Sequence, residues 1–266
     1  VNTMKKRKTR AASLVLALAM TTGLLAGCSQ SSGGSSDTGE QRDDIIIATA
    51  NETPSLSPTE HIAVAGSYMN LLTYNTLFRT GMDLEPEPDL VESYENVSET
   101  QWNFTIKQGV KFHDGTEMTV EDVKASLEWA KTFPEVSLYN NDIVSVDIVD
   151  DTTVQITTDG PDAMLLNNLC HHRNAIVPKA LIDAGHDFNT EPIGTGPYQF
   201  VEWNRGDSIV FEAFEDYFKG APAIKKMTWK VIPEGSSRTI ALEAGEVDFV
   251  VEVEGMDADR LKENPD

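Results

Sequence analysis

Two short runs carry side chains that could do acid, base or metal chemistry. His113 and Asp114 are neighbours, and Cys170, His171 and His172 are three consecutive residues of metal-ligating types. His113 and Asp114 precede a glycine in a stretch typical of a tight turn, which explains them without catalysis. Consecutive helical residues point about 100° apart, whereas zinc ligands stand one helical turn apart or across a turn, and no partner at metal spacing lies nearby. We therefore expect no catalytic residue, no metal site and no cofactor.

Other catalytic patterns are missing from the sequence. With 43 acidic residues some carboxylate pairs are inevitable, and none follows a glycosidase pattern. The sequence holds no Gly-x-Ser-x-Gly nucleophile elbow. Residues 194–196 read Gly-Thr-Gly, but a phosphate loop needs a helix next, whereas Pro197 and the alternating Tyr198 and Phe200 begin a strand. These patterns predict a protein that is not an enzyme, with an exported hydrolase as the alternative.

The charge and the cysteine content further limit the kinds of protein that the sequence could encode. The formal net charge is −22, which repels nucleic acid and anionic lipid head groups, and the aromatic residues are interleaved with acidic rather than basic ones. We expect no nucleic-acid partner. Cys170 follows the apolar residues Met164, Leu165, Leu166 and Leu169, which favours a small buried hydrophobic role. Because the other cysteine, Cys28, directly follows the predicted signal peptide and is expected to carry lipid, no disulfide framework is expected.

The N-terminal residues predict export and lipidation. Basic residues at 5–10 precede an apolar stretch at 11–25 that is too short for a comfortable membrane span. The stretch ends in Leu-Ala-Gly-Cys, a lipobox in which the Cys28 sulfur would accept a diacylglyceryl group. We expect a signal peptide over 1–27 and a flexible Ser/Gly-rich tether over 28–44. This predicts a protein anchored by lipid alone at the outer face of the cytoplasmic membrane or in the periplasm, with an ordinary secretory leader as the alternative.

Local patterns predict the elements that would position the candidate residues. Trp102, Phe104 and Ile106 alternate with polar residues, the pattern of a half-buried strand. After the turn, Thr119 and Asp122 form a near capping box at a helix start. Together these predict a strand, a short strand at 110–112, a tight turn and a capped helix.

Alternating strands and short helices are expected along the rest of the chain. The unbroken apolar run at 45–48 predicts a strand covered on both faces. Pro161 and Pro178 are expected at first helical positions, with Gly185 closing the second of these helices. Further strands are expected at 144–149 and 153–157, which form a hairpin, from 198 onward, and at 209–213, 227–233 and 247–251; further helices are expected at 64–72 and 238–242.

Several runs resemble one family. Residues 108–116, Gln-Gly-Val-Lys-Phe-His-Asp-Gly-Thr, followed by Thr-Val-Glu-Asp-Val at 119–123, are similar to a segment of the bacterial extracellular solute-binding protein family 5. These proteins are oligopeptide, dipeptide and nickel receptors of ABC importers. The resemblance spans residues 45–255, with further matching runs at 74–79, 85–94, 194–198 and 216–220.

The resemblance implies an α/β fold of the periplasmic-binding-protein type II, with two lobes of mixed sheets flanked by helices. It assigns a first lobe to about 45–75 and 190–255 and an inserted subdomain to about 76–189. Family members are considerably longer, so we expect the sequence to be truncated, with its second lobe missing. In the family the loop after the first strand lies at the ligand cleft, which makes Thr53, Ser55 and Leu56 expected ligand contacts; an ordinary proline loop is the alternative.

A function follows from the same resemblance. It implies a monomeric receptor that captures a small solute by hinge closure and delivers it to permease and ATPase subunits. A peptide is the favoured solute. Three alternatives stay open: a nickel complex as the solute, another small molecule as the solute, and use of the fold for signalling. They stay open because the residues that would bind a peptide amino terminus or a nickel complex belong to the second lobe.

Overall fold

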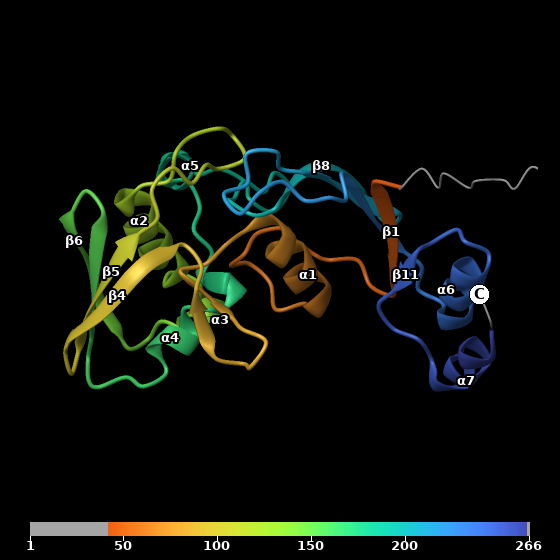
Figure 1. Cartoon of the computed structure of the whole chain (residues 1–266), viewed down its shortest axis with the longest axis horizontal. Helices are drawn as coiled ribbons and strands as arrows, with labels where there is room; N and C mark the ends of the chain where they lie inside the picture. Colours follow the sequence, from red (N-terminus) through yellow and green to blue (C-terminus); the bar gives the residue numbers. More distant parts are fainter. Residues whose placement is uncertain (1–41, 265–266) are drawn as a thin grey trace, which may run out of the picture. The chain divides into compact units, whose positions relative to one another are not determined.

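The computed structural model describes residues 42–264, and its helices and strands are shown in Figure 1. The predicted signal peptide, Cys28 and nearly all of the predicted tether lie outside the described residues. Strands form a five-stranded, a four-stranded and a two-stranded sheet. In the part of the chain that the structure describes, no helix is long and apolar enough to cross a membrane.

The five-stranded sheet is mixed and has the strand order β11-β1-β10-β9-β8. β1 runs parallel to β10 and β11, and the remaining pairs are antiparallel. Its strands are β1 (Asp44–Thr49), β8 (Tyr198–Asn204), β9 (Ser208–Ala213), β10 (Lys226–Val231) and β11 (Phe249–Val250). All five come from the ranges predicted for the first lobe, except that β1 begins one residue earlier, at Asp44.

β1 confirms the prediction of a strand covered on both faces. Ile45 and Ile47 pack into a core cluster with Trp229, while Ile46 and Ala48 face a second cluster beneath the helix α6 (Gly235–Glu243). An unbroken apolar run fits this position because the side chains on both faces of the strand are removed from water.

The four-stranded sheet is antiparallel and comes from the range predicted for the inserted subdomain. Its order is β4 (Val91–Ser98), β5 (Gln101–Ile106), β7 (Thr153–Thr158) and β6 (Ile143–Asp150), and the predicted strand and hairpin are confirmed. The helix α2 (Val120–Ala130) lies against this sheet (Figure 1). Phe104, Val123, Leu127 and Ile156 are fully buried between them. The division into lobe and subdomain itself stays a prediction.

The other elements are short. They are the strands β2 (Phe78–Thr80) and β3 (Pro86–Pro88), the 3-10 turn η1 (His172–Asn174), and the helices α1 (Val64–Thr73), α3 (Pro134–Ser137), α4 (Leu165–Asn168), α5 (Lys179–Ala184) and α7 (Gly255–Glu263). α1 and α6 confirm the predicted helices at 64–72 and 238–242.

One carboxylate caps two helices. In the predicted capping box of α2, which is confirmed, Asp122 Oδ2 accepts hydrogen bonds from the amide and the hydroxyl of Thr119 at 2.8 Å each. The other oxygen, Oδ1, accepts the Lys179 amide at the start of α5 at 2.7 Å. Asp122 therefore joins the two helix N-termini, where a negative charge is favoured.

Several predicted boundaries are wrong. Pro161 does not begin a helix: the Met164 amide donates to Asp162 Oδ1 at 2.7 Å, and α4 starts only after this turn. Pro178 is the residue before the first turn of α5, while Gly185 closes α5 at φ +66° as predicted. Residues 110–112 form a single bridge instead of a strand. The last two strands are shorter than expected because each pairs only along part of its apolar run.

Candidate functional site

Two of the family-like runs meet at His113. The His113 amide donates to the Gly194 carbonyl at 2.9 Å, and its ring Nε2 donates to the Gly196 carbonyl at 2.9 Å. The Gly194 amide approaches Nδ1 at 3.4 Å, which assigns the ring proton to Nε2. Burial lowers the pKa of His113 to about 4, so the ring is neutral near pH 7. Asp114 instead accepts from the amide and hydroxyl of Thr116, so the two neighbours form no acid and base pair.

The two glycines allow the loop to touch the end of α1. A Cβ atom on Gly194 would lie 2.3 Å from the Thr73 carbonyl oxygen, and one on Gly196 would lie 2.4 Å from the Leu72 carbonyl oxygen. The Gly196 amide donates to the Thr73 carbonyl at 2.8 Å. Any side chain would push the backbones apart, which explains the Gly-Thr-Gly run by packing and not by phosphate binding.

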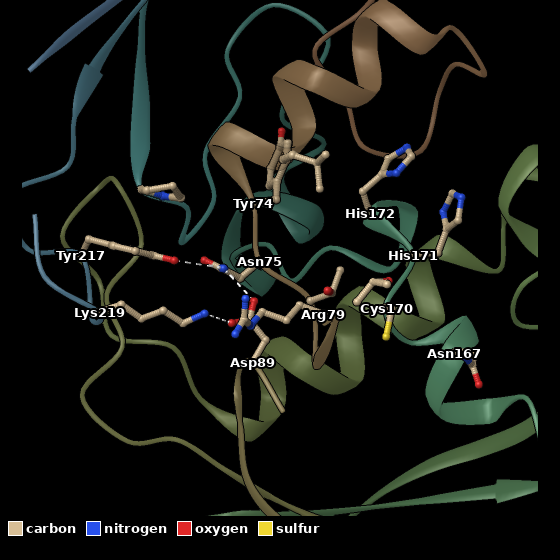
Figure 2. A pocket seen from close by; sticks show the side chains of 14 residues that line it. Tyr74, Asn75, Arg79, Asp89, Asn167, Cys170, His171, His172, Tyr217 and Lys219 are labelled. Atoms are coloured by element: carbon tan, nitrogen blue, oxygen red, sulfur yellow. Dashed lines mark hydrogen bonds and ion pairs between the residues drawn. The ribbon is translucent and has the colours of Figure 1, made fainter. Parts of the chain in front are cut away.

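A pocket of about 600 Å³ lies beside this contact (Figure 2). Its walls come from the end of α1, from β2, from the segment around α4 and η1, and from the loop after β9. The lining residues are Leu71, Tyr74, Asn75, Thr76, Arg79, Thr80, Asp89, Asn167, Cys170, His171, His172, Pro197, Tyr217 and Lys219.

A hydrogen-bonded network around Asp89 forms one side of the pocket (Figure 2). Asp89 is only 3% exposed; its Oδ2 accepts the Asn75 side-chain amide at 2.8 Å, and its Oδ1 pairs with the Lys219 ammonium. The Asn75 amide also donates to the Tyr217 hydroxyl at 3.4 Å, and Asn75 Oδ1 accepts the buried Thr195 hydroxyl at 3.2 Å. Burial raises the pKa of Tyr217. The carboxylate and its partners therefore hold one another in place.

Cys170, His171 and His172 form the opposite side. Cys170 and His171 lie between α4 and η1, and His172 begins η1, so the three are not on one helix as considered above. Cys170 packs against the core but is half-buried and reaches the pocket, so the prediction of a small buried hydrophobic residue is only partly confirmed. Its thiol donates to the Leu166 carbonyl at 3.3 Å, and burial raises its pKa. Among the described residues, no group of three or more His, Cys, Asp or Glu side chains is arranged to hold a metal ion.

The three residues predicted to contact a ligand lie outside this pocket. Thr53, Ser55 and Leu56 are buried, and none of them lines this pocket. The Thr53 hydroxyl donates to the Ser55 carbonyl at 2.5 Å, the Ser55 hydroxyl bonds the Asn189 side chain, and the Leu56 amide donates to the Asn189 carbonyl at 3.1 Å. These bonds hold the proline loop in shape. Contact of the three residues with a ligand stays a prediction.

Sequence reasoning missed the polar network of the pocket. Asn75, Asp89, Tyr217 and Lys219 were not singled out, although all four lie in the runs that match the family, at 74–79, 85–94 and 216–220. Their positions in those runs were the available signal.

Comparisons with known proteins identify the family. Solved structures with a similar fold include the oligopeptide-binding protein AppA from Bacillus subtilis in complex with a nonapeptide, with 28% sequence identity, a TM-score of 0.76 and coverage of 83% of this chain and 46% of AppA. A nickel ABC transporter structure from Bacillus halodurans has 27% identity and a TM-score of 0.73, covering 84% and 46% of the two chains. The neighbours are periplasmic binding proteins, which confirms the predicted fold class.

Comparison of the sequence with known families and proteins gives the same result as the comparison of structures. The family described as "Bacterial extracellular solute-binding proteins, family 5 Middle" matches residues 85–266, and the chain belongs to this family, as its runs predicted. The glutathione-binding protein GsiB of Salmonella typhimurium is 32% identical over 234 residues, which cover 83% of this chain and 44% of GsiB. GsiB of Escherichia coli O157:H7 is 30% identical over 263 residues, covering 94% and 48%. The chain spans less than half the length of these curated relatives.

Proposed function

We propose that the protein is the extracytoplasmic solute receptor of an ABC importer and that its solute is a peptide. The observation that carries the proposal is the family match over residues 85–266, extended by relatives whose names or titles give glutathione and a nonapeptide as ligands. The pocket supports it, because Asn75, Asp89, Tyr217 and Lys219 form a preorganised polar network without a nucleophile and base pair. Binding without turnover is the activity that such a site favours.

The mechanism proposed is capture by hinge closure. A solute enters an open cleft between two lobes, closure buries it, and the closed receptor delivers it to permease and ATPase subunits. We further propose that the receptor acts as a monomer outside the cytoplasmic membrane, anchored through lipid on Cys28, and that Thr53, Ser55 and Leu56 border the cleft. None of these steps needs a catalytic residue.

Peptide uptake by living cells tests the proposal. Deleting the gene should abolish uptake of a labelled mixture of short peptides, and the intact gene should restore it, with peptides inside a peptidase-deficient host recovered uncleaved. A Cys28→Ala variant should leave the membrane fraction, which tests the anchor separately. Unchanged uptake in the deletion strain, or cleavage of peptides by the purified protein, would contradict the receptor function and favour the exported hydrolase.

A further inference from the structure

Arg173 is a buried cation that has no ion-pair partner in the part of the chain that the structure describes. Its side chain is only 9% exposed, Nη1 donates to the Glu135 carbonyl at 3.2 Å, and Nε has no hydrogen-bond partner. Among residues 42–264, no carboxylate forms an ion pair with it. The other buried arginine, Arg238, donates to three backbone carbonyls instead. A buried guanidinium normally requires such compensation.

Arg173 lies behind the histidine side of the pocket. Its guanidinium carbon is 5.9 Å from the centroid of the Tyr139 ring. The Tyr139 ring stacks on His171 with 3.8 Å between centroids, and the His171 ring lies 4.4 Å from that of His172. Both histidines line the pocket, where Figure 2 shows them next to Cys170. The positive charge therefore acts on the pocket across a short stack of rings.

The histidines offer neutral N–H donors. The Arg173 amide approaches His171 Nδ1 at 3.4 Å, so the ring proton of His171 is on Nε2, which has no partner among the described residues. His172 Nε2 lies 3.3 Å from the Ser67 hydroxyl. Burial, reinforced by the charge of Arg173, lowers the pKa of His171 to about 4; burial, His171 and Arg173 lower that of His172 to about 3. Neither imidazole can supply a compensating negative charge.

The pocket also differs in charge from the rest of the chain. The chain carries a formal charge of −22, yet Asp89 is the only carboxylate that lines the pocket, and it is already paired with Lys219. Arg79 is a second lining cation, and it forms an exposed ion pair with Glu87, which is not among the lining residues. An anionic group entering on the histidine side would meet donors and an uncompensated charge, whereas a cation would meet repulsion.

We propose that the histidine side of the pocket, His171 and His172 backed by Arg173, receives a carboxylate of the solute. The inference rests on the proposed function and deepens it, because it assigns the negatively charged end of a peptide or peptide-like solute to this half of the protein. His171 donates through Nε2, and Arg173 supplies the counter-charge from behind the ring stack.

Histidine ring signals of the intact protein test the site directly. Two-dimensional ¹H–¹⁵N spectra are recorded during titration with acetate, inorganic phosphate and methylammonium chloride at constant ionic strength. Acetate should shift the His171 and His172 ring signals in a saturable way, and methylammonium should not. Arg173→Gln should weaken acetate binding at least about tenfold. The control Arg205→Gln removes an exposed arginine that stacks on Trp203, and it should leave acetate binding unchanged.

A second variant guards against misfolding of Arg173→Gln. His171→Phe keeps a ring against Tyr139 but removes the donor, and it should also weaken acetate binding while circular dichroism stays unchanged. The proposal is overturned if acetate shifts neither ring, if phosphate alone binds, if methylammonium binds equally well, or if both pocket variants bind acetate like the parent. The outcome is independent of peptide uptake, so failure of this site and failure of the receptor function are distinguishable.

Discussion

Acidification should destabilise the fold through His113, because burial keeps its ring neutral although the hydrogen bond to the Gly196 carbonyl favours the protonated form. Its pKa is about 4 in the folded protein against an ordinary value of 6.5. The folded state therefore binds fewer protons than the unfolded state between these values. The contribution of His113 is fully present above pH 6.5 and is lost as the pH falls toward 4. Between pH 8 and pH 5 the loss amounts to about 2 kcal/mol of unfolding free energy.

A His113→Gln variant isolates this effect. Glutamine keeps one donor for the Gly196 carbonyl and one acceptor for the Gly194 amide, but it does not titrate near neutral pH. Urea unfolding is measured for both proteins at pH 8 and pH 5. Contributions from the carboxylates and the other histidines are common to both and cancel in the comparison. The parent should lose about 2 kcal/mol more than the variant between these pH values. Equal losses would refute the assignment of a buried neutral ring.

Three further substitutions test buried contacts of the fold by urea unfolding at pH 7. Gly196→Ala places a methyl group against the Leu72 carbonyl and should cost about 3 kcal/mol, whereas Gly160→Ala, with open space around the new methyl, should cost little; similar values would contradict the close backbone contact. Asp122→Ala removes the cap of both α2 and α5 and should cost about 2 kcal/mol; a loss below 0.5 kcal/mol would dispute the shared cap. Lys219→Met leaves Asp89 buried without its cation and should cost about 2 kcal/mol, while Lys225→Met breaks an exposed pair with Glu215 and should cost under about 0.5 kcal/mol; no difference between the two would argue against the network.

Helices and strands that are determined by neighbouring residues could be predicted from the sequence. The apolar run of β1 identifies a strand covered on both faces, and Thr119 with Asp122 identifies the start of α2, because both patterns act within a few residues. The helix predicted to begin at Pro161 was wrong because the side chain of Asp162 forms a turn that delays the helix start. A proline by itself does not reveal such a turn.

The pocket depends on pairs that are far apart in the chain. Asp89 and Lys219 are separated by 130 positions, Asn75 and Thr195 by 120, and His113 and Gly196 by 83. No periodicity or local spacing links such residues. The family-like runs contained all six of these residues, but their pairing became visible only in the fold.

The most direct test of the receptor function is identification of the solute that the protein carries. The protein is purified from its own host without added ligand and denatured, and the released small molecules are identified by mass spectrometry against a mock purification. We predict a peptide or peptide-like solute with a free carboxylate, in near-equimolar amount and chemically intact. Release of cleavage products, or of no solute from a protein that also binds none on titration with peptides, would contradict the account.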